Sequence, residues 1–333
     1  MIDRRHLLRR AGAGAAGLSL AQLLGPAAAF ASGGGDFPDH PRWRFVFVSH
    51  ETLDPLFVAT QFGAQDAAAL VRCSVQWTGS PRGSVEETVR SLRAAISGKA
   101  DGIAVSLPDP RAFWPALDAA RQAGIPVVAF NVGAANGRIP YTGSDPAASG
   151  RRAGRELARS VPSGTVVLFA PTEPSPSQVT RLRGVQSGLG RSAPIVRLGG
   201  DLRNQERQVD AAFRDHAGAR GAIALDRAGT VALGTVLKRS GRSLPAGGFD
   251  LLPNDLALVS GGPLAFVVDQ QPYVQGFSPV LQLFLARISE RTVAPWDTET
   301  SVLLRKADIQ ALVATKSRYE GSTSRHEYPL RRA

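Results

Sequence analysis

The sequence predicts an α/β protein with two doubly wound lobes, each built on a parallel sheet. The clearest observation is the segment 101–133, where an apolar run at 103–105 is followed by helix-spaced apolar residues and a second apolar run at 127–130. Two wholly apolar strands joined by one helix indicate a parallel sheet with both faces covered. Ligands of such sheets bind beyond the carboxyl ends of the strands, so we expect the site after 105 and after 130.

The first lobe contains three predicted β-α repeats in a row. Strands are expected at 44–48, 73–77 and 103–105, and each is followed by a helix-spaced apolar pattern. Ser84 is placed to cap the second helix, because its hydroxyl can accept from the free amides of the first turn. Three successive repeats predict the doubly wound, Rossmann-like architecture.

A second series of the same construction follows a turn-rich break at 141–146. Its strands are expected at 165–170, 195–198, 221–225, 246–249 and 264–268, and its helices at 147–160, 179–189, 205–214, 230–239 and 274–288, with a proline-rich loop at 171–178. Two such lobes place their strand ends opposite each other, so the ligand is expected in the cleft between the lobes. The predicted boundaries are an N-terminal lobe of 42–143 plus 272–298, a C-terminal lobe of 144–271 plus 299–320, and a tail of 321–333.

Composition excludes several function classes. The formal net charge is +11, but the basic residues are scattered among acids and form no block interleaved with aromatic residues, so no nucleic-acid partner is expected. Cys73 is the only cysteine, which excludes an intramolecular disulfide and a thiol-rich metal site. The chain contains none of the motifs G-x-x-x-x-G-K-[ST], H-E-x-x-H and G-x-S-x-G. We therefore expect no catalytic residue, no cofactor and no metal.

The amino terminus resembles a twin-arginine export signal. Arg4 and Arg5 lie in the run D-R-R-H-L-L-R, a weakly apolar segment follows, and 29–31 form an A-x-A cleavage site. We expect a signal peptide at 1–31 that is cleaved after Ala31, a flexible lead-in at 32–41, and a periplasmic mature protein. An uncleaved membrane anchor is the alternative, because the apolar stretch is nearly long enough to span a bilayer.

Short phrases spread over most of the chain carry a family resemblance. They run in order from about Trp43 to about Val313, and together they resemble the periplasmic sugar-binding proteins of ribose-type ABC importers, the type I periplasmic binding proteins. The resemblance implies a monomeric two-lobed clamp with three hinge crossings, near 143–144, 270–272 and 295–299. It also implies no catalysis, and delivery of a small polyhydroxylated ligand to a membrane ABC permease. The phrases are Val48-Ser49-His50, Asp54-Pro55-Leu56-Phe57, Asp101-Gly102-Ile103, Gly124-Ile125-Pro126-Val127-Val128, Arg183-Gly184, Gly248-Phe249-Asp250 and Gln270-Gln271-Pro272-Tyr273-Val274-Gln275-Gly276.

The same resemblance implies a set of ligand-binding residues. Most are polar groups that would bond ligand hydroxyls, and one is an aromatic ring that would lie against a sugar ring. Asn131-Val132 departs from the charged pair usual in the family, so a polyol, an inositol or a modified sugar fits as well as a simple sugar. The implied residues are Asp54, Phe57, Asn131, Arg183, Asp226, Asp250 and Gln270.

Three of these roles have a structural alternative. Phe57 could face the core, Asp54 could cap a helix, and Arg183 could pair with Glu173. His50 stands beside a glutamate, but no second metal ligand lies at a suitable spacing, so its role stays open. The sequence also leaves open whether the clamp serves a transporter or presents its ligand to a chemoreceptor or sensor kinase.

Overall fold

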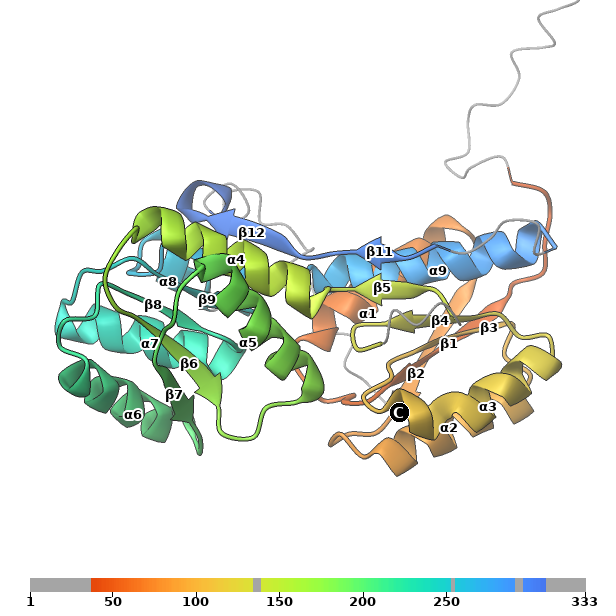
Figure 1. The fold of residues 1–333 in the computed structure, drawn as a ribbon. Coiled ribbons are helices and arrows are strands. Elements are labelled where there is room, and N and C mark those ends of the chain that lie inside the picture. Colours follow the sequence, from red (N-terminus) through yellow and green to blue (C-terminus); the bar gives the residue numbers. More distant parts are fainter. Residues whose placement is uncertain (1–36, 134–138, 253–254, 291–295, 310–333) are drawn as a thin grey trace, which may run out of the picture. The chain divides into compact units, whose positions relative to one another are not determined.

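The protein, seen here as a computed structural model, contains two six-stranded sheets, each in its own α/β lobe (Figure 1). The structure describes residues 37–133, 139–252, 255–290 and 296–309. The chain divides into two units, Met1–Phe37 and Pro38–Ala333, and everything below concerns the second. The predicted signal peptide and the predicted tail at 321–333 lie outside the described residues, as does half of the lead-in, 32–36. The two mainly parallel sheets confirm the predicted fold class.

The sheet of the N-terminal lobe has the strand order β11-β5-β4-β3-β1-β2, with every pair parallel. A parallel neighbour must be reached by a crossover, which the helices supply. Its elements are β1 (Arg44–Ser49), α1 (Phe57–Leu70), β2 (Ser74–Gly79), α2 (Val85–Ser97), β3 (Gly102–Val105), α3 (Pro110–Gln122), β4 (Val127–Phe130), β5 (Tyr141–Gly143), α9 (Pro272–Ile288) and β11 (Thr298–Glu299).

Helices cover both faces of this sheet because alternate strand residues point to opposite sides. In β1, Phe45 and Phe47 belong to the core cluster formed with α1 and α9. Their neighbours Val46 and Val48 belong to the cluster formed with α2 and α3. The helices cover the two faces of the sheet but not the carboxyl ends of its strands, so these ends are free to contact a ligand.

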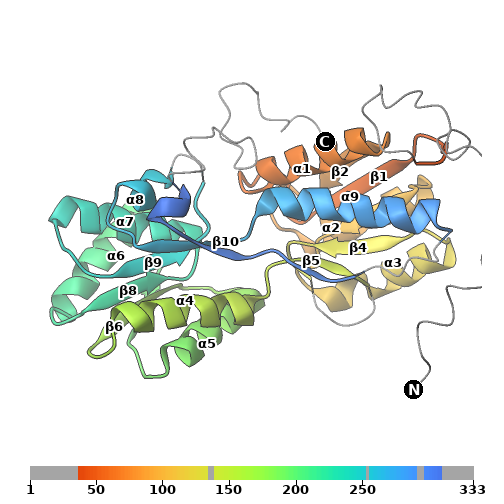
Figure 2. The same ribbon diagram turned by 90° about the horizontal axis from the view of Figure 1, so that it is seen from above.

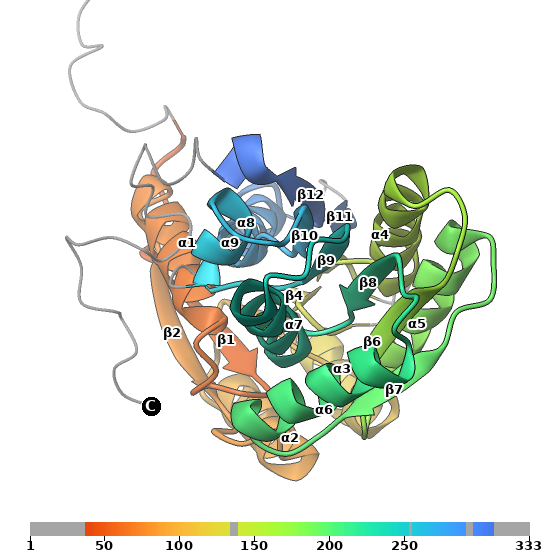
Figure 3. The same cartoon turned by 90° about the vertical axis from the view of Figure 1, so that its left-hand side faces the viewer.

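The sheet of the C-terminal lobe has the corresponding order β12-β10-β9-β8-β6-β7, with only β12 antiparallel. Val167 and Phe169 pack with α6 and α7, whereas Val166 and Leu168 pack with α4 and α5 on the opposite face (Figure 3). Its elements are α4 (Pro146–Ser160), β6 (Val166–Pro171), α5 (Pro176–Leu189), β7 (Ile195–Leu198), α6 (Leu202–Asp215), β8 (Gly221–Ala224), α7 (Arg227–Ser240), β9 (Ala246–Phe249), α8 (Ala257–Ser260), β10 (Phe266–Asp269) and β12 (Val302–Arg305).

Three segments lead from one sheet to the other (Figure 2). They connect β5 to α4, β10 to α9, and β11 to β12. Of the three predicted hinge regions, only 295 lies outside the described residues. The exact lobe boundaries stay a prediction.

Two expected loops contain regular structure instead. The turn-rich break at 141–146 contains β5, a three-residue strand that pairs with β4 and β11. The proline-rich loop at 171–178 ends earlier than expected, because α5 already begins at Pro176. Ser175 and Gln178 form a capping box there, and proline is well tolerated in the first turn, where its missing N–H has no partner to lose.

Cys73 offers a simple check of the core. Its side chain is buried, and this burial raises the pKa of the thiol to about 11. Since the thiolate is the reactive form, we expect labelling of the native protein by a thiol reagent at pH 8 to be at least tenfold slower than labelling of the unfolded chain. Equal rates would show that this part of the core is open to solvent.

Over the residues that the structure describes, every helix is too short or too polar to cross a lipid bilayer.

Candidate functional site

A buried ion pair marks the strand ends of the C-terminal lobe. Arg181, on the second turn of α5, donates from Nη1 to the carbonyl oxygen of Leu225 (2.8 Å) and to Oδ2 of Asp250 (3.3 Å). Its guanidinium also lies over the ring of Phe249, 4.4 Å from the centroid. Leu225 follows β8 and Asp250 follows β9, so one arginine joins two neighbouring strand ends.

This pair leaves one donor and one acceptor unsatisfied. Arg181 Nε and Asp250 Oδ1 are both buried, and neither has a hydrogen-bond partner among the described residues. The two residues are only 7% and 8% exposed. Buried polar groups are normally paired, because an unmet one costs about 1–3 kcal/mol. A bound hydroxyl, which both donates and accepts, would satisfy such atoms.

Asp226 lies beside this pair and has a structural role of its own. Its side chain caps α7 by accepting from the N–H of Gly229 (2.9 Å). Burial raises the pKa of Asp226, while the bond from Gly229 and the charge of Arg181 act in the opposite direction. The structure thus brings together two of the residues expected from the sequence, Asp226 and Asp250.

Asn131 and Asp250 occupy corresponding positions in the two lobes. Each directly follows the fourth strand of its lobe, and each has a φ of 58°, in the left-handed region. Asparagine and aspartate tolerate this region better than other non-glycine residues. Such backbone geometry is often found at functional sites, which supports a ligand-facing role for both ends.

The amide of Asn131 reaches a buried glutamine, Gln275, which belongs to a network that joins all three crossings. Asn131 Nδ2 donates to Gln275 Oε1 (3.0 Å), and Gln275 Nε2 donates to the carbonyl oxygen of Gln270 (2.9 Å) and to Oγ1 of Thr300 (3.2 Å). The backbone N–H of Thr300 donates to the carbonyl oxygen of Gly143 (3.0 Å). Gln270 therefore contributes its backbone carbonyl to this hinge network.

The N-terminal lobe contributes a polar wall after β1. His50 donates its backbone N–H to Ser106 Oγ (2.8 Å), and its ring Nδ1 lies 2.9 Å from the same oxygen. Asp54 Oδ1 accepts from the N–H of Leu56 (2.8 Å), so one oxygen of this carboxylate is bonded within the turn that precedes α1. Burial, followed by the neighbouring carboxylate of Asp54, raises the pKa of Glu51.

A groove of about 640 Å³ is lined from both lobes. This volume falls within the roughly 300–1,000 Å³ typical of small-molecule sites. The lining comes from the loops after β1, β3 and β4 in one lobe and from the start of α4 and α5 in the other; it includes His50, Glu51, Val132, Ser175, Gln178 and Thr180.

The pKa of His50 predicts an acid sensitivity of the fold. Burial lowers this pKa to about 4, although the charge of Asp54 acts in the opposite direction. Between pH 6.5 and about 4 the unfolded state therefore binds a proton that the folded state does not, so His50 lowers the stability as the pH falls. Between pH 7 and pH 4.5, we expect the free energy of unfolding of the wild type to fall by up to about 2 kcal/mol more than that of His50→Gln. Urea unfolding at the two pH values measures both losses. Parallel losses in the two proteins would contradict this assignment.

Two of the expected residues add no polar atom to the groups described above. Phe57 is 1% exposed, and its ring packs against His50, Trp77 and Phe130 in the core. Arg183 lies on the exposed side of α5. The buried arginine of this helix is Arg181, which the sequence reasoning missed.

Helical spacing could have found Arg181. Gly184, Val185 and Leu189 form the buried face of α5. Residue 181 lies three positions before Gly184 and four before Val185, so it falls on the same face of the helix. Arg181 satisfies this spacing and Arg183 does not. Among the described residues, no cluster of three or more His, Cys, Asp or Glu side chains could hold a metal ion.

Comparison with known proteins identifies the family. The model of the periplasmic binding protein domain matches residues 45–286, well over half of the chain. The chain therefore belongs to the periplasmic binding protein family, which confirms the resemblance found in the sequence. It is 36% identical over 320 residues to the xylose/arabinose-binding protein XylF of Sulfolobus acidocaldarius, covering 88% of this chain and 78% of the relative. Proteins of this family are periplasmic or extracellular.

Solved structures show the same fold. A carbohydrate transporter protein of Acidothermus cellulolyticus in complex with myo-inositol is 26% identical, with a TM-score of 0.71 over 84% of this chain and 100% of that one. An ABC transporter solute-binding protein of Burkholderia graminis in complex with D-arabinose is 22% identical, with a TM-score of 0.72 over 82% of this chain and 98% of that one.

Proposed function

We propose that this protein captures a sugar or polyol between its lobes and delivers it to an ABC transporter permease. The observation that carries the proposal is the pair of buried, unpartnered atoms at the strand ends, Arg181 Nε and Asp250 Oδ1. A ligand hydroxyl can satisfy both a donor and an acceptor, and a polyhydroxylated ligand offers several such groups. The relative named as a xylose/arabinose-binding protein makes these two pentoses the first candidates.

Binding residues follow from the same reasoning. Arg181, Asp226 and Asp250 would hold the ligand from the C-terminal lobe, and Asn131 and His50 would hold it from the N-terminal lobe. Asp54 and Gln270 remain candidate ligand contacts, Asp54 through the oxygen that does not bond Leu56. For Phe57 we propose a supporting role behind His50, and for Arg183 no contact.

Lobe closure would couple binding to transport. A ligand held from both lobes binds the closed arrangement more tightly than the open one, and this difference in affinity stabilises the closed arrangement. The Gln275 network, which bonds Asn131 as well as the crossings, would transmit ligand contacts to the hinge. Transport is favoured over signalling because structural neighbours are described as ABC transporter proteins. No catalytic step is proposed.

A thermal-shift screen tests the proposal. A ligand that binds only the native state raises the melting temperature, and the rise grows with the ratio of the ligand concentration to Kd. We expect at least one of xylose, arabinose, ribose, glucose and myo-inositol to stabilise the protein at millimolar concentration and to be recovered unchanged. No shift with any member of a broad sugar and polyol panel would refute sugar capture, and turnover of a sugar would refute the binding-only role.

Export by the twin-arginine route is a separate proposal. It rests on Arg4, Arg5 and the cleavage pattern ending at Ala31. Expression of the full chain in a bacterial host should give a periplasmic product that begins at Ser32, and replacing both arginines by lysine should retain it in the cytoplasm. An exported double variant would rule out this route, and a retained N-terminus would indicate an anchor.

A further inference from the structure

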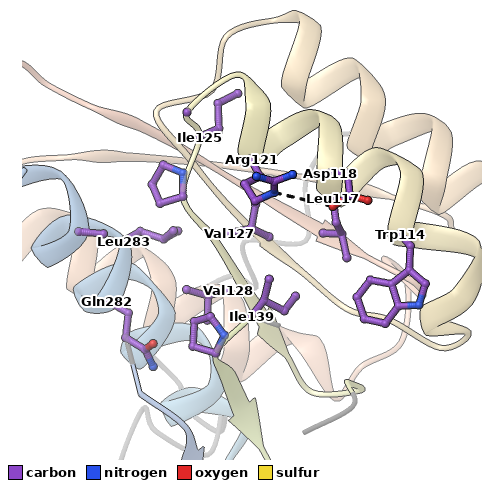
Figure 4. A pocket seen from close by; sticks show the side chains of 14 residues that line it. Trp114, Leu117, Asp118, Arg121, Ile125, Val127, Val128, Ile139, Gln282 and Leu283 are labelled. Atoms are coloured by element: carbon purple, nitrogen blue, oxygen red, sulfur yellow. Dashed lines mark ion pairs between the residues drawn. The ribbon is translucent and has the colours of Figure 1, made fainter. Parts of the chain in front are cut away.

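A second groove lies in the N-terminal lobe, at the opposite end of β4 from the proposed sugar site. Its volume is about 490 Å³, within the range of small-molecule sites. Val127, the first residue of β4, lines it, whereas Asn131 follows the last. Figure 4 shows the side chains of α3 on one side, those of α9 on the other and β4 between them.

The wall of this groove is mainly apolar. Asp118 and Arg121 form an ion pair there (3.8 Å), with both side chains more than half exposed. Most of the remaining side chains are aliphatic or aromatic: Trp114, Leu117, Val128, Ile139, Leu283 and Ala286. An apolar lining with few polar groups is typical of sites for small molecules rather than for ions.

A buried carbonyl oxygen in the lining has no partner. Gln282 is 1% exposed, and its Nε2 donates to Thr142 Oγ1 (3.1 Å) and approaches Ser278 Oγ (3.5 Å). Its Oε1 is buried and accepts no hydrogen bond from any described residue. Because such an atom is costly to leave unmet, it favours an occupant that carries a donor.

The start of β4 adds a second acceptor. In the β4–β5 ladder, Ala129 N donates to Pro140 O (2.7 Å) and Asn131 N donates to Thr142 O (3.0 Å). In this register the carbonyl oxygen of Val127 would accept from the N–H of residue 140. Proline has no N–H, so the ladder supplies no donor to Val127 at the groove.

We propose that this groove is a second small-molecule site, for a compound with a ring-sized apolar body and one hydrogen-bond donor. The apolar body would fill the space between α3 and α9. The donor would bond Gln282 Oε1 or the carbonyl oxygen of Val127. This site is independent of the sugar proposal, because it shares no lining residue with the cleft between the lobes.

Two probes of nearly equal shape test the need for a donor. Phenol carries a hydroxyl, and fluorobenzene carries none. We expect titration of the full chain, labelled with ¹⁵N, to move the amide signals of Val128, Leu283 and Ala286, with phenol binding at least fivefold more tightly than fluorobenzene. Equal affinities, or phenol-induced shifts that gather at Asn131 and Asp250 instead, would overturn the proposal.

Matched variants locate the site. Ala286→Phe should fill the groove and weaken phenol binding at least tenfold, while Ala119→Phe, on the exposed side of α3, should leave it unchanged. Gln282→Met should weaken phenol binding and lower the preference for phenol over fluorobenzene. Thr142→Val removes one partner of Gln282 Nε2 and leaves Oε1 in place, so it should keep that preference. If Ala286→Phe does not fold, the Gln282 and Thr142 variants decide; an unchanged preference in Gln282→Met would refute the role of Oε1.

Discussion

Replacing Arg181 by methionine is expected to weaken sugar binding at least hundredfold. The substitution removes the unpartnered Nε and leaves Asp250 without the cation it pairs with at 3.3 Å. Breaking a buried charged hydrogen bond typically costs about 3–5 kcal/mol, and a ligand hydroxyl would lose its donor as well. The affinity is to be measured by isothermal titration with the best sugar from the thermal screen.

Arg183 provides the matched control, because it lies two residues further along the same helix and is exposed. Arg183→Met should bind the sugar as wild type does, within a factor of about two, and should melt at nearly the same temperature. Circular dichroism of Arg181→Met must show native secondary structure for the comparison to hold. Weaker binding in Arg183→Met with unchanged binding in Arg181→Met would reverse the assignment.

Gly276→Ala is expected to destabilise the fold by about 3 kcal/mol or more. Gly276 lies in the first half of α9, and an added Cβ there would overlap the carbonyl oxygen of Thr60 and lie 2.8 Å from the N of Ala64. On the other helix, a Cβ at Gly63 would meet the backbone of Tyr273. The two helix backbones are thus in direct contact, and overpacking against backbone atoms cannot be relieved by a side-chain rotation.

Gly218 is a suitable control because an added Cβ there would meet nothing within 4 Å. Gly218→Ala should be neutral, or more stable by up to about 1 kcal/mol because the unfolded chain loses freedom. Urea unfolding of both variants measures the difference. A Gly276→Ala protein as stable as wild type would mean that α1 and α9 pack less closely than described.

The sequence predicted the fold where hydrophobic period and strand length gave a clear signal. The run at 103–105 and the helix at 274–288 were found to within two residues, because each has a long or wholly apolar pattern. The strand β5 was missed, because three residues between turn formers carry no period. It pairs with β4 on one side and, on the other, with β11, about 155 residues later, a contact that local reasoning does not detect.

The sequence predicted the strand ends at which the candidate site lies more fully than the side chains found there. The strand ends that hold Asn131, Asp226 and Asp250 followed from the parallel sheet. Arg181, the buried arginine of α5, was not among the candidates because family phrases were matched by letter and not by helix face. The bond from Asn131 to Gln275 joins residues 144 positions apart, so only the fold brings them together.

The crystal structure of a sugar complex tests the central claim most directly. The account predicts that ligand hydroxyls lie at hydrogen-bond distance, about 2.7–3.2 Å, from both Arg181 Nε and Asp250 Oδ1, with further contacts from the N-terminal lobe. A bound sugar that leaves both atoms without a partner would contradict it.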